Sequence, residues 1–301
     1  MFKTFRRENA VEKIFDIFIY LTAIFVLIIT LYPFLNILAV SLNDSVDAAR
    51  GGIGILPRKF SLANYQEIFK YKSIPHAFII SILRTIIGTV TGIVASCMVA
   101  YTLSRKDFMA RKIFGVLFVL TMYISGGLIP DYMLVRKLHM VNNFAVYILP
   151  GLINTWNVIV IRSFMDNLPY SLQESAKIDG ASDFVVFMKI VMPLCLPVIA
   201  TISLFIAVGQ WNSWMDTFLY ASSKDSLSTL QYELVKVMSN TTASAGQAEA
   251  LKNQTSASAN TVSPESIRMA ITIVATVPIL VVYPFLQKYF VSGMTLGAVK
   301  Q

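Results

Sequence analysis

The sequence predicts an all-α polytopic membrane protein with six transmembrane helices. Hydrophobic residues make up 55% of the 301 residues and charged residues only 14%, which is too apolar for a soluble domain of this size. The long apolar runs also lack the alternation of apolar and polar positions, at helical spacing, that a soluble core shows. Runs near the ~20 residues needed to cross hydrocarbon lie at 14–40, 75–103, 113–130, 144–165, 190–215 and 267–290.

The first run follows several basic residues and is too long for a cleavable signal peptide. We therefore expect 1–13 to be a terminal tail, 14–290 a transmembrane domain and 291–301 a second tail. Pro33, Pro278 and Pro284 interrupt runs, which membranes tolerate where neighbouring groups satisfy the freed carbonyls. The spacing of Gly88 and Gly92 favours close packing against another helix.

The density of Lys and Arg in the short connections favours an N-terminus in the cytoplasm. Ser104–Lys112 is the clearest segment, since it carries Arg105, Lys106, Arg111 and Lys112. This orientation also places both tails and the polar loop at 166–190 inside.

On the outer side, two long connections differ in character. Residues 41–72 mix Gly, Pro, basic and aromatic residues and should fold as short elements. Residues 239–263 hold almost no large apolar side chain, so we expect a mobile loop.

The positive net charge of +8 does not indicate nucleic-acid binding, because the aromatic residues lie inside apolar runs rather than among the basic ones. The basic residues are expected to flank membrane segments. Cys97 and Cys195 lie in apolar stretches, and His76 and His139 are isolated. We therefore expect no metal site, no disulfide framework and no cofactor on this chain.

The polar loop at 166–190 has the pattern of a helix hairpin. Ser171 can cap a first helix and Glu174 complements the positive end of its dipole, while Gly180 can end it in the left-handed conformation. Ala181 to Lys189 should form a second short helix with Phe184, Phe187 and Ile190 as its apolar face. An ordinary hairpin between two spans would have the same features, so this pattern alone leaves the role of the loop open.

The spacing Glu174-x-Ala176-x-x-Asp179-Gly180-Ala181, followed by Ile190, Pro193 and Pro197, resembles the EAA coupling loop of ATP-binding-cassette (ABC) import permeases. Five further segments resemble MalG-like carbohydrate importer permeases, in particular their oligosaccharide or polysaccharide branch. They are Ser125–Tyr132, Asn154–Asn157, Gln210–Asp216, Ser263–Ala270 and Phe290–Lys300. Ser175 departs from the second position of the EAA signature, and Gln301 stands where many relatives end in Gly.

The resemblance implies the type I importer permease (MetI-like) fold in the bacterial cytoplasmic membrane. It implies a second permease subunit, two ATPase subunits that bind ATP and Mg, and an extracellular solute-binding protein, with no catalysis on this chain. It also implies ATPase-coupling roles for Glu174, Ala176, Asp179, Gly180, Ala181, Phe187 and Ile190.

Sugars present apolar faces and hydroxyl rims, so a translocation path requires aromatic, amide and acidic side chains. Trp211, Asn212, Trp214 and Asp216 supply that mixture, although Trp also anchors helices at the interface. Asn154 and Asn157 lie three residues apart and are either path residues or interhelical hydrogen-bond partners.

Arg84 lies about ten residues into the second run, where a buried charge requires a partner or a polar cavity. It could pair with an acid such as Asp216, bind an anionic sugar such as a uronate oligosaccharide, or extend to the interface.

Other transport and membrane functions remain as alternatives. ABC permeases for peptides share an EAA-like loop, and the fifth run, rich in Trp and Asn, favours a sugar over a peptide. A secondary transporter would be expected to carry internal repeats or several intramembrane charges, and a membrane enzyme would need convergent His, Cys or acidic residues. The sequence shows neither pattern.

Overall fold

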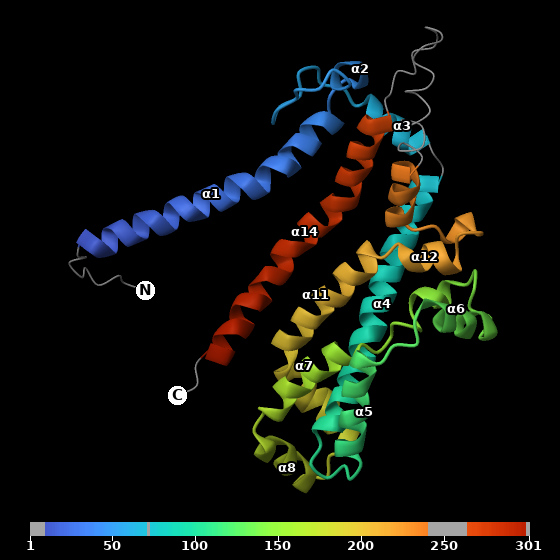
Figure 1. Ribbon diagram of the computed structural model, residues 1–301. Helices are drawn as coiled ribbons and strands as arrows, with labels where there is room; N and C mark the ends of the chain where they lie inside the picture. The colour runs from blue at the N-terminus through green and yellow to red at the C-terminus, as the bar shows by residue number, and fades with distance from the viewer. Residues whose placement is uncertain (1–9, 71–72, 240–263, 299–301) are drawn as a thin grey trace. The chain divides into compact units, whose positions relative to one another are not determined.

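The computed structural model describes residues 10–70, 73–239 and 264–298, which form helices and irregular connections without a β-strand (Figure 1). An isolated antiparallel bridge joins Asn43 and Phe60. The chain divides into two compact units, residues 1–70 with 240–274 and residues 71–239 with 275–301. Helix α14 (Pro264–Ala298) crosses the boundary between them, and the tail expected at 291–301 is helical as far as Ala298.

The first unit begins with α1 (Ala10–Ser41), whose apolar side chains are exposed around the helix and which contains Pro33. Two short helices follow, α2 (Ser45–Ala48) and α3 (Ala63–Lys70). The buried Asn64 side chain joins them to the end of α1, since Nδ2 donates to the carbonyl oxygens of Ser41 at 2.8 Å and Asn43 at 3.0 Å. These elements agree with the short folded segments expected over 41–72.

The second unit is organised around α4 (Ser73–Ser104), which packs against α7 (Thr155–Asp166) and α11 (Leu196–Asn212) (Figure 1). Gly88 lets the side chain of Gln210 on α11 approach α4, because a Cβ at that position would lie 2.8 Å from Gln210 Cδ. The close packing predicted from the glycine spacing is therefore confirmed at Gly88. At Gly92 the same added Cβ would meet Ile206 at an ordinary 3.5 Å.

Within the described residues, three helices are long and apolar enough to cross a membrane, over Lys13–Ser41, Ser73–Ser104 and Glu265–Val282. Two bent pairs could each provide one more span. The chain bends by 116° between α5 (Arg111–Tyr123) and α6 (Leu128–Lys137), and by 82° between the helical segment Asp183–Leu194 and α11. The described chain thus supplies three to five spans, and the predicted count of six is not confirmed.

The run at 144–165 shows why the count falls short. It forms a 3-10 turn, η1 (Phe144–Tyr147), and then an irregular stretch through Pro150 and Gly151 before the 12-residue α7 begins. Asn154 caps α7 by accepting a hydrogen bond from the backbone N–H of Asn157 at 3.2 Å. A 12-residue helix rises about 18 Å, less than the ~30 Å of a hydrocarbon core.

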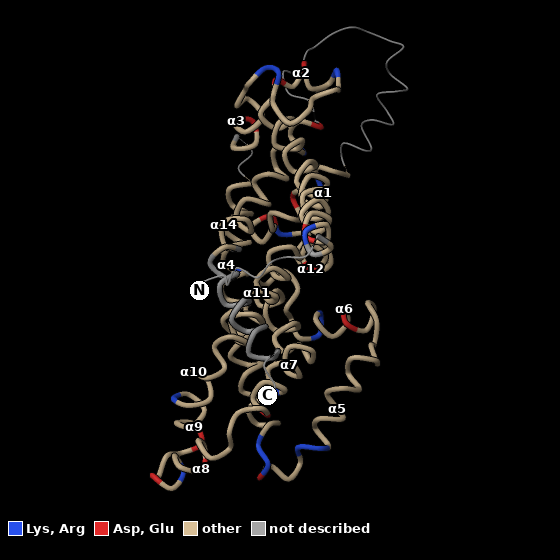
Figure 2. Tube along the Cα trace, turned by 90° about the vertical axis from the view of Figure 1, so that its left-hand side faces the viewer, with Lys and Arg blue, Asp and Glu red and all other residues tan. Residues whose placement is uncertain are grey.

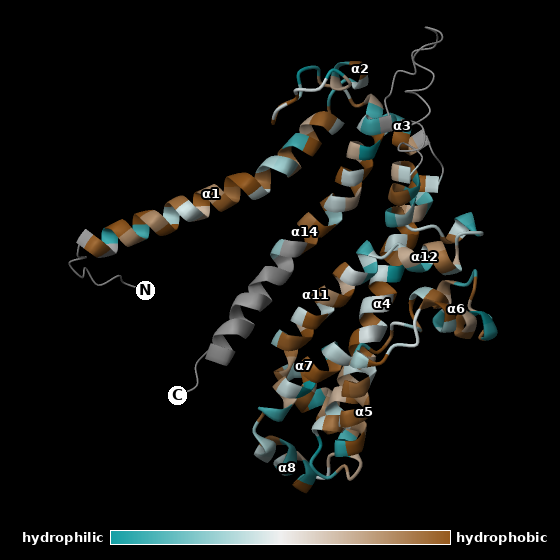
Figure 3. Cartoon of the chain, in the orientation of Figure 1, coloured by the Kyte–Doolittle hydropathy of each residue, from teal (hydrophilic) through white to brown (hydrophobic). Residues whose placement is uncertain are grey.

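The loop at 166–190 contains α8 (Tyr170–Ile178) and α9 (Asp183–Val186) and continues through a π-helical turn, η2 (Phe187–Val191), into α10 (Met192–Leu194). Figure 2 shows α8, α9 and α10 following one another at one end of the second unit. Figure 3 shows α8 mainly hydrophilic, in contrast to α11. Beyond α11 lie α12 (Met215–Tyr220), η3 (Asp225–Leu227) and a helix over 230–239. The loop expected to be mobile, 239–263, lies outside the described residues except for Ser239.

Candidate functional site

The second unit contains a cavity of about 560 Å³ between α4, the segment around η1, α7 and α11. We call it the Arg84 cavity. Its lining combines aromatic rings with amides and one ion pair, and the members used below are Arg84, Tyr147, Asn154, Trp156, Asn157, Phe205, Gln210 and Asp216. The volume falls within the range of ~300–1,000 Å³ typical of small-molecule sites.

Arg84 is buried, with only 2% of its surface exposed. It forms a bidentate ion pair with Asp216, in which Nη1 donates to Oδ1 at 3.1 Å and Nη2 donates to Oδ2. Its Nε donates to Gln210 Oε1 at 3.0 Å, and its guanidinium lies 4.5 Å from the centre of the Tyr147 ring. Of the three roles considered for Arg84, this structure shows the pairing with Asp216.

The partners of Arg84 are themselves fixed by hydrogen bonds. Asp216 Oδ1 also accepts from Ser213 Oγ and from the backbone N–H of Thr217, both at 3.0 Å. Gln210 Nε2 donates to the carbonyl oxygen of Tyr147 at 3.3 Å. A buried charge is tolerated when it is paired and hydrogen-bonded, and this network meets that condition.

Of the residues predicted for the path, Arg84, Asn154, Asn157 and Asp216 line this cavity together. The other three do not line it. Trp211 is 6% exposed, and its Nε1 donates to the carbonyl oxygen of Ala275 at 2.9 Å, which ties α11 to α14. Asn212 Oδ1 accepts from Gln231 Nε2 at 3.2 Å, and Trp214 packs beside Phe218 with ring centres 6.2 Å apart.

Of the lining members named above, sequence reasoning missed four: Tyr147, Trp156, Phe205 and Gln210. Trp156 is 46% exposed, and its ring centre lies 5.6 Å from that of Phe205, so an aromatic surface is presented beside Asn157. Trp156 and Gln210 stand inside the two motifs that carried the resemblance, which was the available signal. Tyr147 and Phe205 lie inside apolar runs and had no such signal.

The loop at 166–190 differs from the prediction at its start. Pro169, not Ser171, stands at the N-cap of α8 and makes no side-chain capping bond, so the predicted Ser171 cap is wrong. A proline supplies a backbone φ suited to a helix start, and the helix therefore begins at Tyr170. Glu174 consequently lies beyond the first turn, and the predicted dipole interaction does not apply.

The end of α8 agrees with the prediction. Gly180 has a φ of +80°, and the N–H groups of Gly180 and Ala181 donate to the carbonyl oxygens of Lys177 and Ala176 at 3.0 and 2.9 Å. This is the glycine-terminated helix end expected from the sequence. Ser182 then caps α9 by accepting from the N–H of Val185 at 3.4 Å.

The predicted coupling residues divide between two environments. Glu174, Asp179 and Gly180 are exposed. Ala176 and Ala181 are half-buried against the core of the second unit, and Phe187 is 5% exposed with its ring 5.1 Å from that of Tyr101. Ile190 is half-buried. The second helix thus has no single apolar face, because Phe184 is 68% exposed while Phe187 is buried in the core.

Known proteins resemble this chain in sequence and in structure. No protein-family model matches the chain. The polygalacturonan/rhamnogalacturonan transport system permease protein YtcP of Bacillus subtilis (strain 168) is 39% identical over 292 residues, which cover 96% of this chain and 99% of that protein. A crystal structure of a bacterial ABC transporter involved in the import of the acidic polysaccharide alginate matches with a TM-score of 0.83 and 26% identity, covering 95% of this chain and 99% of the matched chain.

A second crystal structure, of a bacterial alginate ABC transporter in complex with an alginate pentasaccharide-bound periplasmic protein, matches with a TM-score of 0.57 and 15% identity. It covers 91% of this chain and 93% of the matched chain and shows a likeness of fold.

Proposed function

This chain belongs to the permease subunits of sugar ABC transporters, and from that premise we propose that it forms one half of an importing path for oligosaccharides. The observation that carries the proposal is the Arg84 cavity, whose lining brings together Trp156, Asn157 and Gln210. An aromatic face can pack against the C–H face of a sugar while amides bond its hydroxyl groups. Permease subunits are transport components, and ATP hydrolysis is assigned to partner subunits.

We further propose that the cargo contains uronic acid residues. The support is the substrates named for two similar proteins, polygalacturonan or rhamnogalacturonan for one and alginate for the other. Among the described residues lining the cavity, Arg84 is the one cation, and it is paired with Asp216. Because the guanidinium nitrogens of Arg84 are already engaged, a sugar carboxylate would bind here by displacing Asp216 from part of its contact with Arg84.

The loop at 166–190 is proposed to couple this path to an ATPase subunit. Its exposed surface carries Glu174, Ile178, Asp179 and Phe184, and Ile178 is 86% exposed. Exposed apolar side chains rimmed by charged ones are typical of a protein contact. In this scheme Ala176, Ala181 and Phe187 face the core and hold the loop in place, while the exposed residues meet the ATPase.

The remaining assignments follow the same scheme. We propose a multi-pass protein of the bacterial cytoplasmic membrane with its N-terminus inside, paired with a second permease subunit, two ATPase subunits and an extracellular solute-binding protein. The exposed apolar side chains along α1 and α5 are the surfaces that would meet lipid or the second permease. Binding of ATP and Mg is assigned to the ATPase subunits and not to this chain.

The experiment measures sugar uptake by the assembled transporter in proteoliposomes, with binding protein loaded with an oligogalacturonate or a neutral oligosaccharide of equal length. Trp156→Ala should lower uptake roughly tenfold, the equivalent of about 1.4 kcal/mol. Trp214→Ala provides the matched control, because Trp214 does not line the cavity, and its uptake should stay near that of the wild type. Preference for the neutral sugar would contradict the uronate proposal. Uptake of peptides alone would contradict the sugar path.

A further inference from the structure

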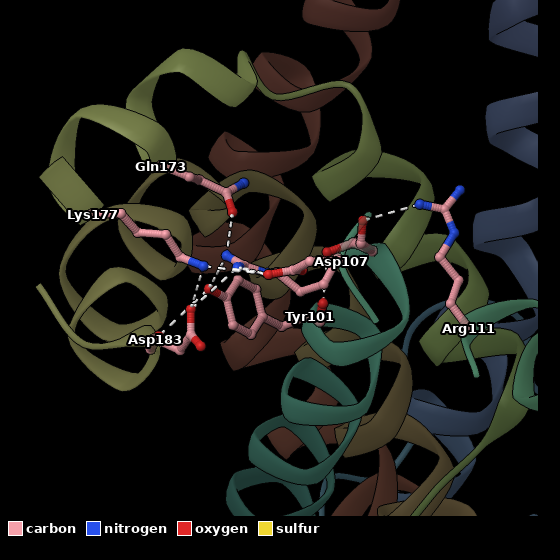
Figure 4. Close-up of polar contacts among 8 residues, drawn as sticks. Tyr101, Asp107, Arg111, Gln173, Lys177 and Asp183 are labelled. Atoms are coloured by element: carbon pink, nitrogen blue, oxygen red, sulfur yellow. Dashed lines mark hydrogen bonds and ion pairs between the residues drawn. The ribbon is translucent and has the colours of Figure 1, made fainter. Parts of the chain in front are cut away.

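Four charged side chains close a ring where the 166–190 loop meets the end of α4. Arg105 Nη2 lies 2.6 Å from an oxygen of Asp107 and 3.2 Å from one of Asp183, while Lys177 Nζ lies 3.4 and 3.2 Å from the same two carboxylates. Each cation therefore contacts both anions, and the ring is neutral. Figure 4 shows Lys177 of the loop directed toward Asp183 and toward Asp107 on the turn after α4. We call these four residues the Arg105 clasp.

Arg105 differs from an ordinary surface partner because its side chain is only 7% exposed. Its Nε and Nη2 donate to the two oxygens of Asp107 at 2.9 and 2.6 Å. Its Nη1 donates to Tyr101 Oη at 3.2 Å and to Gln173 Oε1 at 3.3 Å. All three guanidinium nitrogens are thus engaged, by partners on α4, on the following turn and on the loop, in a planar arrangement that Lys cannot reproduce.

The clasp joins the loop to the same helix that carries Arg84. Arg105 directly follows the last residue of α4, and Arg84 lies 21 positions earlier, which corresponds to about 31 Å of α-helix. No proline lies between these two residues. One end of α4 is therefore fixed to the loop, and its middle contributes Arg84 to the cavity.

We propose that the Arg105 clasp fixes the 166–190 loop to α4, so that displacement of the loop by the ATPase also displaces α4 and the Arg84 side of the cavity. Arg105 is a positioning residue in this scheme, since it contacts neither ATP nor sugar. The inference rests on the proposed function, because it requires an ATPase bound to the loop. Ion pairs between exposed groups contribute little, so the connection depends on the buried Arg105 and not on the number of pairs.

The test compares Arg105→Gln and Arg105→Lys with Arg111→Gln in the assembled complex. Arg111 is a suitable control because it lies in the same basic segment and makes one long hydrogen bond, 3.5 Å from Nη1 to the carbonyl oxygen of Ser104. For each variant the amount of ATPase that copurifies is measured first. The ratio of ATP hydrolysis with and without loaded binding protein follows. A coupling of 1–3 kcal/mol corresponds to about 5–150-fold, so Arg105→Gln should lower this ratio at least about fivefold.

A second readout follows the connection itself. Spin labels on Ser175→Cys in α8 and Thr102→Cys in α4, both at exposed positions, report the distance between loop and helix. The distance distribution should broaden in Arg105→Gln, narrow again in part in Arg105→Lys and stay unchanged in Arg111→Gln. If Arg105→Gln does not assemble, Asp107→Asn opens the ring from a 54% exposed position and should have the same two effects.

The outcomes separate the two proposals. Arg105→Gln could leave the hydrolysis ratio unchanged, with ATPase still bound and the distribution of label distances still narrow. That result would overturn the proposed role of the clasp while leaving the proposed function intact. Equal losses in Arg105→Gln and Arg111→Gln would also overturn it, because the effect would then follow basic charge rather than the clasp. Failure of the wild type to bind an ATPase would refute the proposed function, and the inference with it.

Discussion

The ion pair between Arg84 and Asp216 predicts an unequal response to removal of its two charges. Asp216→Asn leaves the guanidinium charge at a site that is 2% exposed, whereas Arg84→Gln leaves a carboxylate whose side chain is 22% exposed and can be hydrated. Breaking a buried pair from one side costs about 3–5 kcal/mol. We therefore expect a destabilisation of about 3 kcal/mol for Asp216→Asn and a smaller one for Arg84→Gln. The double variant should be more stable than Asp216→Asn.

The chain carries its own reporters for this experiment. Cys97 and Cys195 are both free and fully buried, so a thiol-reactive fluorophore labels them only as the core opens. A shift of about 2–4 °C in Tm per kcal/mol gives roughly 6–12 °C for Asp216→Asn. Asp131→Asn, which changes an exposed acid of α6, should leave Tm near the wild-type value. Equal Tm values for Asp216→Asn and the wild type would show that the buried guanidinium does not depend on Asp216, as would a double variant less stable than Asp216→Asn.

Two further predictions follow from local geometry and charge. Gly88→Ala should displace the Gln210 side chain from Arg84 and reduce uptake, because the added Cβ would lie 2.8 Å from it, while Gly92→Ala meets Ile206 at 3.5 Å and should be tolerated; equal uptake by both variants would contradict this account of the packing. The hydrogen bond from Arg105 lowers the pKa of Asp107, and the hydrogen bond to Asp183 raises the pKa of Lys177. The contribution of Asp107 to stability is therefore complete above its unfolded pKa of about 3.9, and it is lost as the pH falls through the lowered pKa. The contribution of Lys177 to stability is complete below its unfolded pKa of about 10.4, and it is lost as the pH rises through the raised pKa. Label distances between α4 and α8 should thus stay constant from about pH 5 to 9, and broadening near pH 6 or 7 would contradict these directions.

Several features were predictable because they depend on nearby residues. Gly180 ends α8 because only a residue that tolerates positive φ fits there, and the surrounding sequence favours a helix up to that point. The depth of Arg84 within an apolar run required a partner, and Asp216 was named as one of them. The spans over Lys13–Ser41 and Ser73–Ser104 followed from length and hydropathy alone.

Other features depend on contacts between distant parts of the chain, which local patterns do not contain. Trp211 and Trp156 look equally suited to a sugar site, but Trp211 Nε1 bonds a carbonyl 64 residues away while Trp156 faces the cavity. Arg105 read as one of four basic residues beside a membrane segment, and its bond to Gln173 spans 68 residues. Hydropathy likewise did not separate α7 from the irregular stretch before it, since both are apolar.

We propose that the 166–190 loop couples sugar delivery to ATP hydrolysis, and substitution of Gly180 tests that claim. Gly180→Pro imposes a negative φ on a residue that has +80°, whereas Gly180→Asn introduces a residue that tolerates the left-handed conformation. ATP hydrolysis by the assembled complex would be measured with and without sugar-loaded binding protein. We predict that stimulation is lost in Gly180→Pro with the ATPase still bound, and is largely retained in Gly180→Asn. Full stimulation in Gly180→Pro would contradict the claim.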